Sequence, residues 1–371
     1  MTTTINNEHK KLNVPNSTDR GNVIRNVPHL RFPEFEGEWE DFLINDVCSE
    51  FKSGKNIKAD SISESGEYPV YGGNGLRGYT SSYNHEGLYV LIGRQGALCG
   101  NVRSVNGKTY ITEHAIAAAG NEKSNTSFLH YLFLKMNLGQ YSDQSAQPGL
   151  AVNKLLKLEV SLPPISEQKK IAKLLSLLDE RIATQNKIID KLQSLIKGIG
   201  KQLFMDNQNW RTVKIGELLR IGNGKDYKHL SIGKIPVYGT GGQMLLVNDY
   251  LYDGESVCIG RKGTIDTPMF LKGKFWTVDT LFYTYDFKDV LPKFCYYLFL
   301  QINWKLYNEG TGVPSLSKST IENIKVKIPS LEQQQKICSI LDCYEHKTNN
   351  EEQILELYHS EKQYLLRQMF I

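Results

Sequence analysis

The chain has 371 residues, 40% of them hydrophobic, and a formal net charge of +4 at pH 7. That length allows two or three domains with cores of their own. Apolar runs stay short of the roughly eighteen residues that a membrane-spanning helix needs, so the sequence predicts no such helix. The mild positive charge permits a polyanionic partner without requiring one.

Residues 1–30 are predicted to form a flexible N-terminal tail. The start of the chain is polar and lacks the apolar segment that marks a secretory signal. The six cysteines form no CxxC pair and have no histidine at zinc-ligand spacing. We therefore expect free thiols in a reducing, cytoplasmic setting, and no metal site.

The rest of the chain is an internal repeat. YPVYGGNG at 68–75 returns as IPVYGTGG at 235–242, and LIGRQG at 91–96 returns as CIGRKG at 258–263, both 167 residues later. Three further matches follow in the same order, 166 residues apart: 128–138 with 294–304, 163–172 with 329–338, and 201–204 with 367–370. Such a period indicates two copies of one structural unit, which commonly sit about a pseudo-two-fold axis.

The repeat divides the chain after the tail into four predicted parts. These are a first globular module at 31–163, a long helix at 164–206, a second module at 207–329 and a second long helix at 330–371. In each module, aromatic and β-branched runs alternate with glycine-rich turns, which predicts short strands. The blocks at 128–138 and 294–304 predict one buried helix each, so we expect a mixed α/β (α+β) fold.

Both connecting segments carry a heptad seam, in which apolar residues recur at steps of four and three and need a partner helix. The simplest arrangement pairs the two helices as an antiparallel coiled coil; two independent amphipathic helices, each lying on its own module, are the alternative. Gln185 and Glu351 occupy the same mid-seam position of the repeat, where polar residues set register and orientation. The predicted seam residues are Ile171, Leu175, Leu178, Ile182, Gln185, Ile189, Leu192 and Ile196 in the first helix, and Ile337, Leu341, Glu351, Leu355 and Leu365 in the second.

Motifs for catalysis and cofactor binding are missing from the sequence. Residues 73–78 match GxGxxG, but loop and strand follow instead of the helix that a dinucleotide site requires. No HExxH, GxSxG or phosphate-binding GxxxxGK[ST] pattern occurs. Neither does an N-P-P-aromatic or D-P-P-aromatic tetrapeptide, which would hold a flipped adenine. We therefore expect a non-catalytic chain.

The two Gly-Arg loops, by contrast, have a chemistry that suits nucleic acid. Glycine lets a backbone approach phosphates closely, arginine binds guanine edges or phosphates bidentately, and glutamine pairs with an adenine edge. Alternatively, Arg94 and Arg261, which match in both copies, are scaffold residues paired with a carboxylate such as Glu113 or Asp279.

Positions at which the copies differ are the better candidates for specificity. They pair as Gln95 with Lys262, Asn74 with Gly241, Arg77 with Met244, and His114 with Asp279. The full set of predicted DNA-binding residues is Lys55, Tyr71, Asn74, Arg77, Arg94, Gln95, His114 and Gln147 in the first module, and Lys225, Tyr238, Thr240, Gln243, Arg261, Lys262, Asp279 and Thr311 in the second.

Taken together, these segments resemble the specificity subunit of type I restriction–modification enzymes. The resemblance also includes RFPEFEGEWE at 31–40, ITEHAI at 111–116, LPPISEQKKIAKLLSLLDERI at 162–182, and the second-half segments WTVDTLF and IPSLEQQQKI. It implies that each module is a target recognition domain for one half of a split, asymmetric sequence in double-stranded DNA, with the coiled coil as a spacer. One departure is the polar second seam, with Thr348, Glu351 and Lys362, which leaves open a looser pair or an additional contact.

The resemblance also implies the partners. Two methyltransferase (modification) subunits would use S-adenosylmethionine, and restriction (motor–nuclease) subunits would use ATP and Mg, while this chain would bind no cofactor and no membrane. Two alternatives remain at this point. One is a free-standing methyltransferase or nuclease, and the other is a two-module binding protein for a non-DNA ligand such as carbohydrate.

Overall fold

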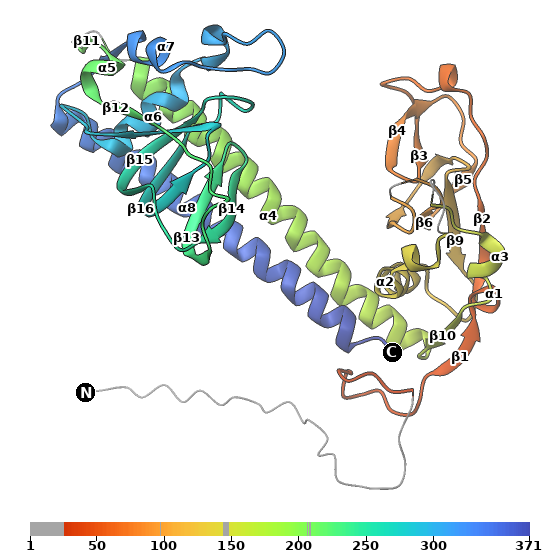
Figure 1. Ribbon diagram of the computed structural model, residues 1–371. Helices are drawn as coiled ribbons and strands as arrows, with labels where there is room; N and C mark the ends of the chain where they lie inside the picture. The colour runs from red at the N-terminus through yellow and green to blue at the C-terminus, as the bar shows by residue number, and fades with distance from the viewer. Residues whose placement is uncertain (1–25, 97, 144–147, 206, 208) are drawn as a thin grey trace, which may run out of the picture. The chain divides into compact units, whose positions relative to one another are not determined.

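The computed structural model describes residues 26–371, except residues 97, 144–147, 206 and 208. Gln147 and most of the predicted N-terminal tail therefore lie outside the described residues. The chain divides into two compact units: one runs to Ile182 and takes in Leu357–Ile371, and the other is Ala183–Glu356. Each unit contains one module together with parts of both long helices (Figure 1).

The first module has three small sheets. One has the strand order β2-β9-β6-β7, a second has the order β4-β3-β8-β5, and β1 pairs with β10. Helix α2 packs against β6, β7 and β9. The elements are β1 (Glu40–Leu43), α1 (Ile44–Val47), β2 (Cys48–Ser53), η1 (Ala59–Ser61), β3 (Tyr68–Gly72), β4 (Gly75–Thr80), β5 (His85–Glu86), β6 (Tyr89–Gly93), β7 (Val102–Val105), β8 (Lys108–Ile111), β9 (Ala115–Gly120), α2 (Thr126–Met136), η2 (Leu138–Tyr141), α3 (Val152–Leu155) and β10 (Glu159–Leu162).

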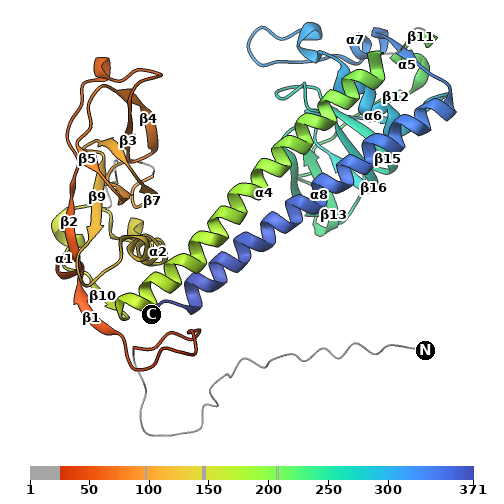
Figure 2. The same cartoon turned by 180° about the vertical axis from the view of Figure 1, so that it is seen from behind.

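The second module repeats this plan, with some of its strands longer. Its main sheet has the order β12-β17-β15-β16-β13-β14, and β11 pairs with β18. Helix α6 packs against β15 and β16 (Figure 2). The elements are β11 (Arg211–Lys214), α5 (Ile215–Leu218), β12 (Arg220–Asn223), β13 (Ile232–Gly239), β14 (Gly242–Val247), β15 (Tyr252–Gly260), β16 (Met269–Thr277), β17 (Leu281–Tyr285), α6 (Pro292–Gln301), η3 (Trp304–Tyr307), α7 (Lys318–Asn323) and β18 (Lys325–Ile328).

Strand pairing confirms that the sequence repeat is a structural repeat. In the first module β3 runs parallel to β8, with Val70 opposite Tyr110. In the second, β13 runs parallel to β16, with Val237 opposite Trp276. A parallel pair within a mostly antiparallel sheet needs a longer connection than a hairpin, and both modules supply it at the same place.

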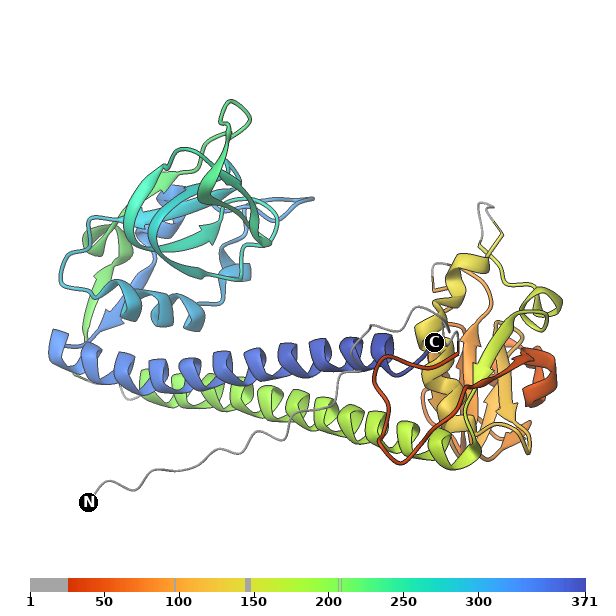
Figure 3. The same ribbon diagram turned by 90° about the horizontal axis from the view of Figure 1, so that it is seen from below.

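The two long helices are α4 (Ile165–Met205) and α8 (Leu331–Gln368). They lie side by side and antiparallel within each unit (Figures 1 and 3): Asp179 of α4 pairs with Lys362 in the first unit, and Gln185 with Glu351 in the second. Most of the predicted seam is confirmed as buried. The buried members are Ile171, Leu175, Leu178, Ile182, Gln185, Ile189, Leu192, Ile337 and Leu341, and the partly buried ones are Ile196, Glu351, Leu355 and Leu365.

The ends of the long helices also pack into the module cores. The alternative prediction, in which each helix lies on its own module, therefore holds for the helix ends but not for their whole length. In the first unit, Ile171 and Leu175 at the start of α4 join a core that includes Met369 and Phe370 beyond the end of α8. In the second, Phe204 at the end of α4 joins Ile337 at the start of α8. Each module is therefore built on the start of one helix and the end of the other.

The polar residues of the second seam all have partners. Gln185 Nε2 donates to Glu351 Oε2 at 2.6 Å and to the Glu351 carbonyl at 2.9 Å. Because these two residues are equivalent in the repeat, the helix pairing is symmetric at this point. Thr348 Oγ1 donates to the Tyr344 carbonyl, and the Lys362 ammonium pairs with Asp179. The polar seam thus makes specific contacts within the helix pair.

A buried glutamine anchors the start of each long helix to its module. Gln168 Oε1 accepts from the Asn125 backbone N–H at 2.8 Å, and Gln168 Nε2 donates to the carbonyls of Lys123 (2.9 Å) and Pro163 (2.8 Å). Gln334 makes the same three kinds of contact in the second module, to the Leu291 N–H and to the carbonyls of Asp289 and Pro329. Both side chains are fully buried, so the anchor satisfies backbone groups that water cannot reach.

Three further observations bear on the expectations from composition. All six cysteines are free, and Cys258, Cys295 and Cys338 are buried. In the described part of the chain, no helix is long and apolar enough to cross a membrane. Nor do the described residues include a group of three or more potential metal ligands of the His, Cys, Asp or Glu type.

Candidate nucleic-acid interface

The Gly-Arg loop of the first module is held between two other loops. The Arg94 N–H donates to the His114 carbonyl at 2.9 Å, and the Leu150 N–H donates to the Arg94 carbonyl at 2.9 Å. The Gly96 N–H adds a bond to the Pro148 carbonyl at 3.0 Å. Three segments far apart in the sequence therefore meet at Arg94.

The second module builds the same three-loop junction. The Arg261 N–H donates to the Thr280 carbonyl at 2.8 Å, and the Leu316 N–H donates to the Arg261 carbonyl at 2.9 Å. The Gly263 N–H donates to the Pro314 carbonyl at 2.8 Å. The backbone scaffold is therefore common to the two modules, and only the side chains on it differ.

Backbone conformation explains the glycine that ends each Gly-Arg loop. Gly96 has φ +83° and Gly263 has φ +93°, a region that favours glycine. At Gly96 an added Cβ would meet nothing within 4 Å, so the requirement at this position comes from the backbone angle and not from crowding.

These hydrogen bonds correct one predicted pairing of the two copies. His114 and Thr280 accept the equivalent bonds, so Thr280 is the counterpart of His114, and Asp279 is the counterpart of Glu113. The prediction that His114 corresponds to Asp279 was wrong by one residue, because the separation of the copies falls from 167 to 166 between the Gly-Arg loop and this one.

The arginine side chains do not form the carboxylate pairs that a scaffold role had suggested. Within the described ranges, neither guanidinium makes an ion pair; Arg261 Nη1 approaches the backbone carbonyl of Asp279 at 3.4 Å. Glu113 instead lies 3.3 Å from His114 Nε2. The backbone of the Gly-Arg loop is thus structural, while the Arg261 side chain is exposed and Arg94 partly so.

In the first module, four of the predicted residues line one recess of about 370 Å³. Asn74 and Arg77 come from the β3–β4 hairpin, Gln95 from the Gly-Arg loop, and His114 from the loop before β9. His114 Nδ1 lies 3.0 Å from Gln95 Oε1. Hydrogen-bonding side chains from three segments therefore converge on this recess, with one positive charge from Arg77.

The second module divides its predicted residues between two recesses. Arg261, Lys262 and Asp279 line one of about 750 Å³. Thr240 and Gln243 line another of about 400 Å³. The larger recess also contains residues that were not predicted, among them Asn223, Glu309 and Lys318. Glu309 lies in the same loop as the predicted Thr311, whereas Asn223 and Lys318 lie outside the segments in which the two copies match.

The remaining predicted residues lie outside these recesses. Lys55 and Lys225 are equivalent to each other. Their backbone N–H groups donate to the carbonyls of Ile111 and Thr277, the last residues of the equivalent strands β8 and β16. Both lysines are exposed, as is Thr311. Tyr71 and Tyr238 pack against the apolar clusters of their modules and thus contribute to the scaffold.

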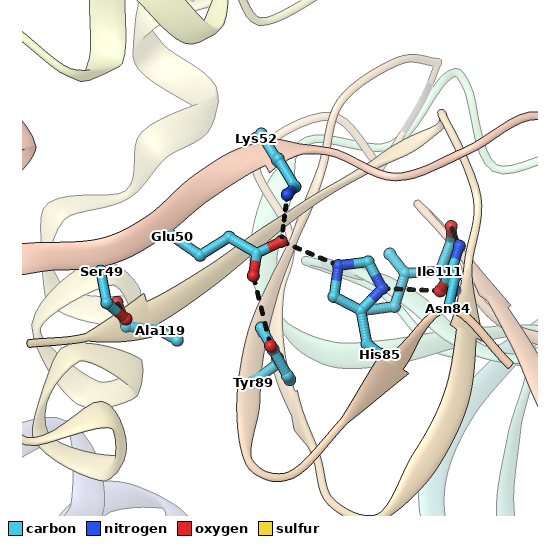
Figure 4. Close-up of polar contacts among 8 residues, drawn as sticks. All are labelled: Ser49, Glu50, Lys52, Asn84, His85, Tyr89, Ile111 and Ala119. Carbon is cyan, nitrogen blue, oxygen red and sulfur yellow. Dashed lines mark hydrogen bonds and ion pairs between the residues drawn. The ribbon is translucent and has the colours of Figure 1, made fainter.

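The first module also contains a charged network that the sequence did not predict (Figure 4). Glu50 on β2 lies 3.0 Å from His85 Nε2 and 3.1 Å from Lys52 Nζ, and accepts from the Tyr89 hydroxyl at 3.2 Å. Burial alone would raise the pKa of Glu50, but Lys52 and His85 outweigh it, and the pKa is lowered.

An asparagine completes this network within the sheet that contains β5 and β8, and the His85–Glu50 contact joins this sheet to the one that contains β2. Asn84 Oδ1 accepts from the Ile111 N–H at 2.8 Å and lies 2.6 Å from His85 Nδ1 (Figure 4). The second module has Arg220 in the place of Glu50, opposite Tyr285 of β17. The two modules therefore differ at this strand position as well as in their loops.

Comparison with known proteins decides the family. The family description "Type I restriction modification DNA specificity domain" matches residues 36–194 and again 207–357. The chain belongs to this family.

Relatives of this specificity family match different shares of the chain, from about two fifths to almost nine tenths. The EcoprrI type I restriction enzyme specificity subunit of Escherichia coli is 42% identical over 154 residues, which are 40% of this chain and 38% of that subunit. The MjaVIII specificity subunit of Methanocaldococcus jannaschii is 24% identical over 88% of this chain and 90% of its own length.

A solved structure supports the fold of this specificity-family chain. The type I restriction–modification S subunit of M. genitalium matches with a TM-score of 0.68 over 93% of this chain and 99% of that one. At 18% sequence identity, the match shows the common architecture of two mixed α/β modules and two long helices.

Proposed function

We propose that this chain is the DNA-reading subunit of a type I restriction–modification complex, in which each module binds one half of a bipartite, asymmetric target. One observation carries the proposal: the same three-loop scaffold occurs twice with different side chains on it. Gln95 stands in one copy where Lys262 stands in the other, and His114 where Thr280 stands. Unlike side chains on like scaffolds would give unlike half-sites.

The available chemistry suits recognition without catalysis. Arginine and lysine bind guanine edges and phosphates, amides bind adenine edges, and hydroxyls bind either. We assign no reacting group to this chain. Methyl transfer would belong to two methyltransferase subunits with S-adenosylmethionine, and cleavage to restriction subunits with ATP and Mg, all acting in the cytoplasm.

Exposed apolar residues on the long helices offer a surface for the methyltransferase subunits. Ile188 and Leu195 of α4, one heptad apart, are 36% and 45% exposed, and Ile340 and Ile354 of α8, two heptads apart, are 42% and 37% exposed. Large exposed apolar residues that recur at heptad spacing are typical of helices with a further helical partner. Changing Leu195 to lysine should weaken co-purification of the methyltransferase subunit, whereas changing the exposed Lys347 to glutamine should not.

Salt dependence of binding tests the proposal against a non-DNA ligand. The complex of this chain with its methyltransferase subunit should bind target duplex with an affinity that falls steeply as salt rises, because bound phosphates release counterions. Replacing one phosphate-binding lysine, for example Lys55 or Lys225, should reduce the slope of log K against log salt by about 1. Binding that is indifferent to salt would contradict the proposal.

A further inference from the structure

The backbone of the residue after the arginine is fixed in each Gly-Arg loop. Gln95 forms an isolated backbone bridge with Gly149, and Lys262 forms the equivalent bridge with Ser315. Both residues precede a glycine with positive φ. Both also follow an arginine whose backbone N–H and carbonyl are hydrogen-bonded. The backbone therefore fixes where each side chain starts, while both side chains are exposed.

In the first module a chain of contacts leads from the interior to Gln95. Glu113 Oε2 is buried and has no hydrogen-bond partner in the part of the chain that the structure describes. Glu113 Oε1 lies 3.3 Å from His114 Nε2, and His114 Nδ1 lies 3.0 Å from Gln95 Oε1. A glutamine side chain loses considerable rotamer entropy when it is immobilised. The Glu113–His114 contact holds the amide in place before any ligand binds, and this preorganisation favours binding.

The second module places different chemistry at the same point. Lys262 is exposed, and within the described residues its ammonium forms no ion pair. Thr280 and Asp279 replace His114 and Glu113. The position therefore carries a positioned amide in one module and an exposed ammonium in the other.

We propose that residues 95 and 262 each read one purine of their half-site in the major groove. Gln95 selects adenine, whose N6 and N7 match an amide, and Lys262 selects guanine, whose O6 and N7 accept from an ammonium. His114 and Glu113 are positioning residues for Gln95. This rests on the proposed function and deepens it, because it names the base that each module recognises at one defined position.

The test exchanges the two side chains in the intact complex. The chain is co-expressed with its methyltransferase subunit in a methylation-free host, and methyladenine is mapped across the genome. Gln95→Lys should change one position of one half-site from an A·T to a G·C pair, and Lys262→Gln should make the reverse change in the other half-site. Each change should shift preference by about 5- to 150-fold, and the half-site of the other module should stay as it is in the wild type.

Positioning by His114 and Glu113 has its own readout. Glu113→Gln and His114→Ala should relax selectivity at the same position that Gln95→Ala relaxes, and should have no further effect in a Gln95→Ala background. Relaxation spread over the whole half-site would mean that these two residues only support the fold.

The outcomes separate this inference from the proposed function. If the wild type methylates without a bipartite motif, the proposed function fails. If the wild-type motif is bipartite and Gln95→Lys and Lys262→Gln leave it unchanged, only the inference fails. Loss of methylation in both exchange variants would also overturn it, because each substitution introduces an exposed side chain that the same scaffold already carries in the other module.

Discussion

Replacing Gln168 with leucine should destabilise the first unit through the loss of three hydrogen bonds. The side chain is fully buried and bonds the Asn125 N–H and the carbonyls of Lys123 and Pro163 at 2.8–2.9 Å. Each backbone group left buried without a partner costs about 1–3 kcal/mol. Leucine offsets part of this by burying apolar surface, so we expect a loss of about 3 kcal/mol in the free energy of unfolding.

Two measurements test this effect: the melting temperature from thermal denaturation, and the rate of hydrogen exchange in each unit. For a unit of roughly 200 residues, 1 kcal/mol corresponds to about 2–4 °C, so the melting temperature should fall by about 6–12 °C. Gln334→Leu is the matched variant, and should accelerate exchange in the second unit instead of the first. Gln335→Leu, at an exposed position of α8, is the control. A shift for Gln168→Leu no larger than that of the control would refute the anchoring role.

Three further predictions concern stability. Burial lowers the pKa of His130 to about 4; because an unfolded histidine takes up its proton near pH 6.5, the first unit should lose up to about 3 kcal/mol as pH falls from 7 to 4. His130→Gln should flatten that part of a pH series of urea denaturation curves, and an unchanged curve would contradict the assignment. The double variant Gln185→Leu with Glu351→Leu should raise the melting temperature, since a polar pair in a seam lowers stability, while Gln185→Leu alone should raise it less or lower it. Arg31→Met should destabilise the first unit by about 3–5 kcal/mol, because it leaves the fully buried Glu167 carboxylate without its bidentate partner; a loss below about 1 kcal/mol in urea denaturation would show that the ion pair is not needed.

Much of the architecture follows from periodicity in the sequence. A heptad seam predicts which face of a helix is buried, and the repeat indicates that the two long helices are equivalent. Together they placed Gln185 and Glu351 at the same level, and the structure shows them bonded to each other. Likewise, matched Gly-Arg loops predicted a common scaffold, which the backbone bonds of Arg94 and Arg261 confirm.

What periodicity did not reveal are contacts between segments that are distant in sequence. Glu50 and His85 meet across 35 residues, and a strand pattern indicates which face a side chain occupies but not its partner. The pairing of His114 with Asp279 was wrong because a one-residue difference between the copies falls inside a loop, where no apolar pattern fixes the alignment. The role of Gln168 was missed because a glutamine in the first turn of a helix is ordinarily exposed.

Two different half-sites are expected, one for each module. The most direct measurement is to co-express the chain with its methyltransferase subunit in a methylation-free host and to map methyladenine across the genome by long-read sequencing. Two modules that read different half-sites should give one motif made of two unlike halves at a fixed separation. Methylation at a symmetric or continuous motif, methylation without any motif, or no methylation despite a stable complex would contradict it.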